Sequence, residues 1–437
     1  MKSLSRTIIP ANWSRNSALV LAVVVVIRSI DASVTVNDSS NNLRPNNLQD
    51  NIYNFDNDSL SRKQKVLRQT RAYHPLIDNL LEAEEVSRSA SIAAFEAGEK
   101  EIQRNMYNNH PYDKRNNGER RLNEDEENED VWKNIRIKAD VTALDSRRDG
   151  TEDMDQRVNF IRDTIIPQTM SYWSQALKVV PVKGNLQIST SELANRLYCG
   201  DSEFSLVPPE HVTDGIPDTD LILYVSASPS SRFCPTGGST LAVAVACNFD
   251  AFDRPTAGAI NFCLDKIDID NMDDPVTIQD NLDVAIHETG HILGMSGNSY
   301  KYFYDPNTGE PRTSRPLKSS TVTCVDNVQR LTTVPDENTM RFFIAANGQR
   351  YASIVTEKVR TVARNQFNCQ TLEGGQLENQ PTGSSCHGDH WDERFYYIEN
   401  LSGVVSSFNN FISPLSLALF EDSGWYKANY TMSEVSF

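Results

Sequence analysis

The middle of the chain contains several apolar runs of strand length. Residues 135–141 alternate between apolar and polar side chains, as a first or edge strand does. Residues 221–225, 241–246 and 257–262 are continuous apolar runs, and they predict three buried strands. These four stretches therefore predict the sheet of the fold.

Helical periodicity occurs on both sides of these strands. Residues 158–180 carry apolar side chains at helical spacing, and Pro167 predicts a kink or break within them. Residues 284–296 have apolar positions that suit a buried helix, with Asp274 before a first-turn proline as its start and Gly294 as its end. A sheet packed on two helices follows from this order, and the predicted fold class is α+β.

The second of these helices carries the motif HExxH. On one helical face, His287 and His291 lie one turn apart, so both imidazoles can bind the same metal ion. Bound Zn²⁺ lowers the pKa of a water to about 7, and Glu288 can take its proton as it attacks a peptide carbonyl. The motif therefore predicts a zinc hydrolase. The alternative is a helix that carries two histidines by chance.

A catalytic zinc site needs a third protein ligand, because HExxH supplies two. Of the other five histidines, His74 and His110 lie in a polar N-terminal stretch, and His211 lies in a proline-rich loop. His387 and His390 remain, three residues apart in one glycine-containing loop. The pattern alone does not choose between them.

Charge limits the partners. The chain has 437 residues and a formal net charge of −17, with no long basic block. This charge argues against nucleic acid as a partner, and it would repel an anionic membrane surface. The length predicts more than one structural unit, and the sequence does not specify an oligomeric state.

The N-terminus contains the one segment that could address a membrane. Residues 17–27 are apolar and follow Lys2, Arg6 and Arg15. The run is too short to span a bilayer, which takes about 20 residues. It predicts a secretory signal over residues 1–32, with an uncleaved signal anchor as the alternative and as the one expected route to a membrane.

Residues 33–130 are polar and contain no cysteine. One part, residues 77–94, predicts a helix, and the segment ends in an acidic run at residues 123–130 that is typical of a linker. Its place between signal and enzyme predicts a pro-region that is processed near Arg121 and would make the chain a zymogen.

The cysteines agree with export. All seven lie after residue 198, and in an oxidising compartment most would pair and one would be left over. They are Cys199, Cys234, Cys247, Cys263, Cys324, Cys369 and Cys386. Sequons at Asn37, Asn57, Asn400 and Asn429 are compatible with a glycoprotein.

The character of the chain changes after the motif. Residues 298–385 are rich in Tyr, Asn, Pro, Thr and Gly with little periodicity, and they predict a loop-rich inserted subdomain. Residues 386–437 form a C-terminal segment, in which residues 414–421 predict a compact apolar helix.

Residues 287–296 resemble the corresponding segment of the leishmanolysin family of metzincin zinc endopeptidases. Most metzincins place the third histidine ten residues after the first, where this chain has Gly297, whereas leishmanolysins carry a long insertion there. Further landmarks of the family follow in order over roughly residues 135–430. They are residues 165–168, 177–179, 199–201, 219–225, 369–373, 388–391 and 415–426.

The resemblance implies a secreted or surface endopeptidase that cleaves proteins or peptides. Its fold would be a metzincin-like mixed sheet with the HExxH helix in residues 131–297, followed by the insertion and the C-terminal segment. It implies Glu288 as the general base and His287, His291 and His390 as ligands of one Zn²⁺. It also implies a disulfide between Cys199 and Cys247.

Some positions depart from the family. Leu401 stands where leishmanolysins have a methionine beneath the zinc, and no cysteine precedes Cys199 to occupy the metal from the pro-region. His74 is an alternative occupant. The chain ends at Phe437, without the family's cysteine-rich tail or an apolar tail for a lipid anchor. A catalytically impaired homologue that acts in cell adhesion or surface binding is therefore the alternative function.

Overall fold

The structure is a computed structural model. It describes residues 83–91, 93, 107, 110–113, 131–238, 240–381, 385–404 and 410–434, which all belong to one unit within residues 60–437. The expected signal at residues 1–32, the acidic run at 123–130, His74, Asn37 and Asn57 lie outside the described residues. No helix among the described residues is long and apolar enough to cross a membrane.

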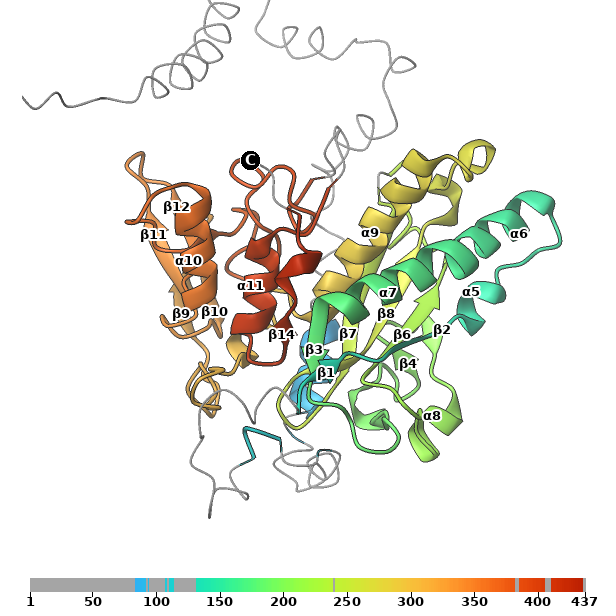
Figure 1. The fold of residues 1–437 in the computed structure, drawn as a ribbon, viewed down its shortest axis with the longest axis horizontal. Coiled ribbons are helices and arrows are strands. Elements are labelled where there is room, and N and C mark those ends of the chain that lie inside the picture. Colours follow the sequence, from blue (N-terminus) through green and yellow to red (C-terminus); the bar gives the residue numbers. More distant parts are fainter. Residues whose placement is uncertain are drawn as a thin grey trace, which may run out of the picture. The chain divides into compact units, whose positions relative to one another are not determined.

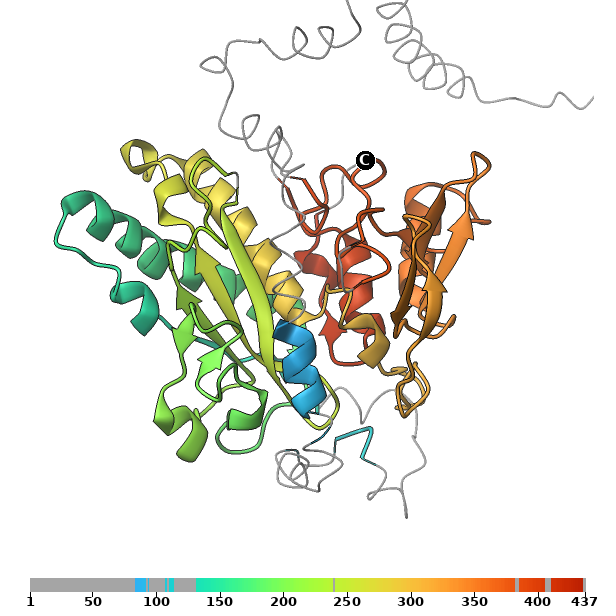
Figure 2. The same ribbon diagram turned by 180° about the vertical axis from the view of Figure 1, so that it is seen from behind.

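A mixed four-stranded sheet forms the N-terminal half (Figures 1 and 2). Its strand order is β2 (Ile137–Asp140), β6 (Leu221–Ser226), β8 (Pro255–Phe262) and β7 (Ala242–Phe249). The first three strands run parallel to one another, and β7 runs antiparallel to β8 at the opposite edge from β2. All four predicted strands are confirmed, including β2 as an edge strand.

The first predicted helix is longer at its start and shorter at its end than residues 158–180. Helical residues run without interruption through α6 (Glu152–Asn159), the π-helical η5 (Phe160–Ile165) and α7 (Ile166–Ala176). Pro167 lies in the first turn of α7, directly after the π-helical turn, and has no amide hydrogen for a regular helical bond. The predicted kink or break is therefore a π-helical turn within a continuous helical stretch. The helix prediction is wrong for Leu177–Val179, which form β3 because their backbone pairs with β1 (Lys133–Asn134).

The second predicted helix is α9 (Pro275–Leu293), and it carries HExxH. It lies beside α7 on the sheet (Figure 1), and the indole Nε1 of the fully buried Trp173 donates to the carbonyl of Ile286 at 3.3 Å. Ile292 packs on the bare α-carbon of Gly258 in β8, where an added Cβ would meet its Cγ2 at 2.5 Å. The helix ends as predicted at Gly294, whose φ of +133° disfavours other residues.

The insertion is more ordered than its sequence indicates. It contains a two-stranded sheet, a three-stranded sheet and the helix α10 (Glu357–Gln366), none of which the sequence predicted, with long connections between them. The strands are short and partly exposed, which removes the long apolar runs by which strands are recognised. They are β9 (Ser320–Thr323), β10 (Gln329–Thr332), β11 (Met340–Ile344), β12 (Arg350–Ile354) and β13 (Gly375–Gln376).

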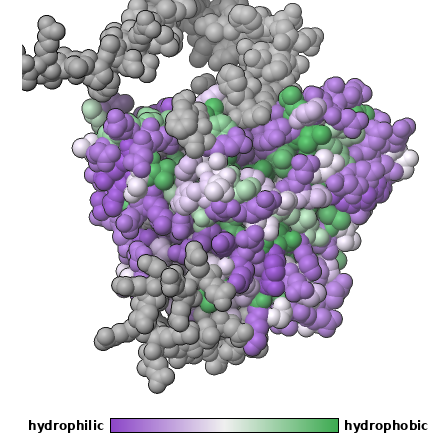
Figure 3. All heavy atoms as spheres, viewed as in Figure 1, coloured by the Kyte–Doolittle hydropathy of each residue, from purple (hydrophilic) through white to green (hydrophobic). Residues whose placement is uncertain are grey.

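The C-terminal segment joins both halves. The predicted apolar helix is α11 (Pro414–Asp422), which contacts α10 and belongs to the same hydrophobic core as α7 and α9. The last strand, β14 (Lys427–Ala428), pairs with β3. Other short elements, besides several single 3-10 turns, are α5 (Thr142–Asp145), β4 (Tyr198–Cys199), β5 (Ser205–Leu206) and α8 (Pro209–Thr213). On the face shown in Figure 3, hydrophilic residues predominate and hydrophobic ones form small groups.

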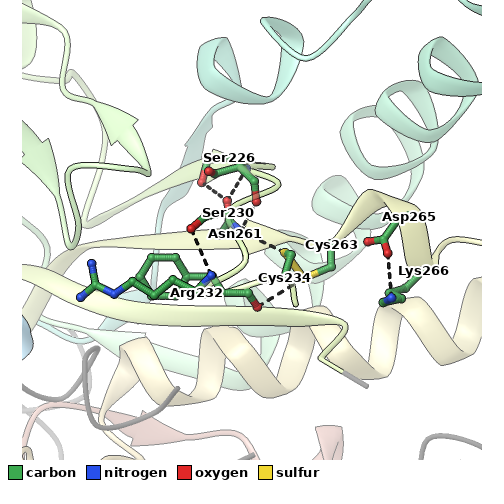
Figure 4. Close-up of a disulfide and its surroundings, with 10 residues drawn as sticks. Ser226, Ser230, Arg232, Cys234, Asn261, Cys263, Asp265 and Lys266 are labelled. Atoms are coloured by element: carbon green, nitrogen blue, oxygen red, sulfur yellow. Dashed lines mark hydrogen bonds and ion pairs between the residues drawn. A yellow bond between two sulfur atoms is a disulfide. The ribbon is translucent and has the colours of Figure 1, made fainter. Parts of the chain in front are cut away.

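Three disulfides link the folded part of the chain. The expected pair Cys199–Cys247 is confirmed, and the others are Cys234–Cys263 and Cys324–Cys386. Among the described residues Cys369 is the free cysteine, as expected from an odd count. Figure 4 shows Cys234–Cys263 beside Asn261, whose side-chain oxygen accepts hydrogen bonds from the Ser226 hydroxyl at 2.9 Å and the Ser228 amide at 2.6 Å.

Candidate metal centre

Three histidine side chains converge at the end of the insertion. His287 and His291 lie one turn apart on α9, and His390 comes from the loop after the insertion, 99 residues beyond His291. The Nε2 atom of His291 lies 3.0 Å from that of His287 and 3.1 Å from that of His390. Two nitrogens bound tetrahedrally to one zinc ion lie about 3.3 Å apart. The three side chains are therefore placed closely enough to hold one metal ion.

The second ring nitrogen of each histidine has a hydrogen-bond acceptor. The Nδ1 atom of His287 lies 2.6 Å from the carbonyl oxygen of Asn400, and that of His291 lies 2.5 Å from the carbonyl oxygen of Met295. The Nδ1 atom of His390 lies 2.7 Å from Oε1 of Glu378. Because these oxygens can only accept, each Nδ1 carries a hydrogen and donates it. In a neutral ring the Nε2 atom then has a free lone pair, which can bind a metal ion. This donor set fits a zinc ion.

Burial also keeps the first two histidines neutral. It lowers the pKa of His287 well below its usual range and that of His291 to about 3. Burial lowers the pKa of His390 as well, but the nearby Glu378 carboxylate and its hydrogen bond outweigh it and raise the value to about 9. The site therefore combines two neutral imidazoles with a third that is paired with a carboxylate.

Glu378 is a contributor that the sequence did not reveal. Its buried carboxylate binds both His390 and the amide of Asp389, the latter at 3.0 Å. A Cβ on Gly388 would come 2.0 Å from Cγ of Glu378, and one on Gly403 would come 2.8 Å from its Oε2. The only sequence signal was the presence of these two glycines near His390. It is weak, because the surrounding residues are rich in glycine.

The expected general base, Glu288, is buried within α9 directly after His287. Burial raises the pKa of its carboxyl group to about 8, and His390 opposes this shift. The interaction with His390 shows that the carboxyl group lies near the three histidines. The role of Glu288 as general base stays a prediction.

The other described histidines lie elsewhere. His387 is buried and stacks on Tyr300 with ring centroids 5.7 Å apart, and its Nδ1 donates to the carbonyl of Gly388. His211 bonds to the hydroxyl of Tyr224 at 2.9 Å, and His110 stacks on Phe252. The structure thus brings His390, rather than His387, to the motif pair.

Asn400 shows why one sequon cannot be used in this fold. Its Nδ2 atom, which would carry a glycan, is buried and donates to the carbonyl of Asp283 at 2.9 Å. Its backbone carbonyl holds His287. Glycosylation at Asn400 is therefore incompatible with the folded protein, and the expectation is wrong at this position.

An α+β body in which an HExxH helix and a distant loop bring three histidines together is the architecture of the metallopeptidase class. A family model described as Leishmanolysin matches residues 150–437. The chain belongs to the leishmanolysin family, which confirms the resemblance of its motifs.

Individual relatives agree with this family. A leishmanolysin-like peptidase of Caenorhabditis elegans is 32% identical over 322 residues, covering 63% of this chain and 46% of the relative. Leishmanolysin of Leishmania amazonensis is 27% identical over 284 residues, covering 64% and 38%. A ciliated left-right organizer metallopeptidase of Xenopus laevis is 31% identical over 224 residues, covering 50% and 26%. The aligned region thus spans less than half the length of each of these relatives.

Proposed function

We propose that this protein is a zinc-dependent endopeptidase that hydrolyses peptide bonds in proteins or peptides. The proposed ligands are His287, His291 and His390. The observation that carries the proposal is the convergence of three Nε2 atoms whose partner nitrogens all face acceptors. Burial keeps His287 and His291 neutral, so each offers an Nε2 lone pair at the point where the three side chains meet, as ligands of one cation do. If the helix carried its two histidines by chance, there would be no reason for a third histidine from a distant loop to lie beside them.

The protein's own groups would perform the proton transfers. Bound zinc would supply a Lewis acid that polarises the scissile carbonyl and acidifies water. Glu288 would accept the proton of the attacking water and then deliver it to the departing amine nitrogen. Asn400, Met295 and Glu378 would hold the three rings in orientation through their Nδ1 hydrogens.

The proposal includes export. Its support is the basic and apolar N-terminus, together with three disulfides, which persist in oxidising compartments. We also propose the division expected from the sequence, with a pro-region at 33–130, a catalytic part at 131–297, an insertion at 298–385 and a C-terminal segment after it. The metzincin-like arrangement of these parts belongs to the same proposal.

The test combines metal content with cleavage. Purified secreted protein is expected to contain about one zinc per chain and to cleave casein. A chelator should abolish cleavage, and added zinc should restore it. Bound zinc without cleavage of casein or of a mixed peptide library would favour the adhesion or binding alternative. Cleavage that persists after complete zinc removal would contradict the proposed mechanism.

A further inference from the structure

Residues 83–91 form a helix that buries its polar side. The positions on this face are Glu84, Ser87, Arg88 and Ser91, whereas Val86 is 62% exposed. A surface helix ordinarily buries apolar residues, and buried polar groups require matching partners. This reversal indicates a helix held by specific polar contacts. We call residues 83–91, 93, 107 and 110–113 the strap.

The guanidinium group of Arg88 occupies an aromatic pocket. Its Cζ lies 3.9 Å from the ring centroid of Phe249 and 4.6 Å from that of Tyr302. The group donates to Oγ of Ser299 at 2.8 Å, and the whole residue is 1% exposed. Flat aromatic faces, a hydroxyl acceptor and a carboxylate form the set that a desolvated guanidinium requires.

That carboxylate is Glu84, one helical turn before Arg88. The two side chains pair at 2.9 Å, and Glu84 also accepts hydrogen bonds from the hydroxyls of Ser296 at 2.8 Å and Ser299 at 3.2 Å. The next residue, Glu85, pairs with Lys301 at 2.8 Å. The buried carboxylate of Glu84 is therefore bound both by Arg88 within the strap and by hydroxyl groups that follow the HExxH helix.

A second set of contacts comes from Tyr107 and Tyr112. The Tyr107 hydroxyl donates to Asp250 at 2.5 Å and accepts from Arg254 at 3.0 Å. The Tyr112 hydroxyl donates to the carbonyl of Gly424 at 2.8 Å. The strap therefore contacts three separate parts of the body, namely residues 249–254, 296–304 and 424–425. In Figure 2 its helix (blue) lies between the sheet and the C-terminal half.

We propose that the strap is a non-covalent component of the folded protein, which stays bound when the chain is cut between residues 113 and 131. Arg88 is its anchor, and the pocket of Phe249, Tyr302, Ser299 and the adjoining Trp425 is a receptor for it. The strap thereby fastens the sheet to the region after the HExxH helix and to the C-terminal segment. This inference does not rest on the proposed peptidase activity.

The test uses the full chain with a recognition sequence for a specific protease inserted after Arg121. After complete cutting, the two fragments should leave a size-exclusion column together under native conditions and separate in denaturant. Arg88→Ala removes the anchor and leaves the carboxylate of Glu84 without its cation. The variant should weaken the association of the fragments roughly thirtyfold or more. Ser89→Ala, on the exposed side of the same turn, is the matched control and should behave as the parent does.

Separation of the parent fragments on the column would overturn the proposal. Equal retention in the parent and in Arg88→Ala would overturn the role of Arg88 as anchor. Arg88→Lys keeps the charge but lacks the planar fork, so intermediate retention is expected. Circular dichroism of each uncut variant shows whether the body is folded before cutting, and a folded Arg88→Ala or Arg88→Lys chain is sufficient for the comparison.

Discussion

The side chain of Leu401 packs against the bare α-carbon of Gly290, inside the HExxH motif. A Cβ on Gly290 would lie 2.6 Å from Cδ2 of Leu401, and Leu401 is fully buried. This leucine stands where the family resemblance placed a methionine. Both side chains are apolar, so the contact can be made by either, and the substitution preserves the packing beneath the motif helix.

Shortening Leu401 should therefore reduce stability more than replacing it with methionine. Leu401→Ala would leave a cavity against α9 and is expected to lower the free energy of unfolding by about 2–5 kcal/mol. Leu401→Met conserves volume and should cost less than about 1.5 kcal/mol. Urea unfolding followed by fluorescence measures both. An equal loss in the two variants would contradict a packing role.

Glu288→Gln tests the general base. The amide has nearly the shape of the carboxylate but cannot accept the proton of water, so turnover should fall by roughly 10²–10⁴-fold. Zinc content should remain near that of the parent, because the three proposed ligands are unchanged. Single-turnover cleavage of a fluorogenic peptide, together with metal analysis, gives both quantities. Loss of zinc with normal cleavage by the remaining loaded protein would refute the assignment.

The two histidines of the 386–391 loop should respond differently. His390→Ala removes a proposed ligand, so it should lower zinc affinity strongly and abolish cleavage. His387→Ala should leave zinc affinity nearly unchanged, but it removes a buried ring stacked on Tyr300 and should reduce stability by about 1–3 kcal/mol. Zinc competition titrations and thermal unfolding separate the two effects. The reverse pattern would make His387 the ligand.

Glu378 should act through the orientation of His390. Glu378→Ala removes the acceptor of the Nδ1 hydrogen and is expected to weaken zinc binding by about 10–100-fold. Glu378→Gln retains an acceptor oxygen without the charge and should lie between alanine and the parent. Competition with a fluorescent chelator measures the three affinities without any activity assay. Equal zinc affinities in the parent and both variants would show that Glu378 does not contribute to metal binding.

The strap should bind less well at acidic pH. Burial against Phe252 lowers the pKa of His110 to about 3, with Asp250 and Asp113 opposing this shift and Arg254 reinforcing it. The bound state therefore disfavours the charged ring, whereas the released ring titrates near 6.5. Binding should be strongest above pH 6.5 and weaken about tenfold for each unit below it.

Fragment retention between pH 7.5 and 5 measures this dependence in the cut protein. His110→Phe keeps a ring on Phe252 but cannot be charged, so its retention should vary much less over the same range. An identical pH profile in the parent and the variant would assign the dependence to other groups.

The sequence predicted the elements that carry strong local patterns. The strands β6, β7 and β8 are nearly continuous apolar runs, and α9 has a proline start, a glycine end and an unmistakable motif. These features depend on neighbouring residues alone, so they can be read without a structure. The same holds for two of the three converging histidines.

The remaining parts depend on contacts between distant residues. Leu177–Val179 form a strand because β1 and β14 lie beside them, although their spacing continues a helical pattern. Glu378 is one of many carboxylates, and only the fold shows that it is buried against His390. Residues alone left His387 and His390 as equal candidates. The family resemblance favoured His390, and in the structure it is His390 that lies beside the two motif histidines.

The long interval between His291 and His390 also has a consequence for synthesis on the ribosome. When the HExxH helix emerges, the nascent chain holds two of the three imidazoles, and a further 99 residues must be translated before the third exists. The loop with His390 begins at Cys386, which is bonded to Cys324 within the insertion. The three histidines can therefore come together only after the insertion has been synthesised and has folded back onto the HExxH helix. A prematurely terminated chain that ends within the insertion would carry the motif but not the full metal centre.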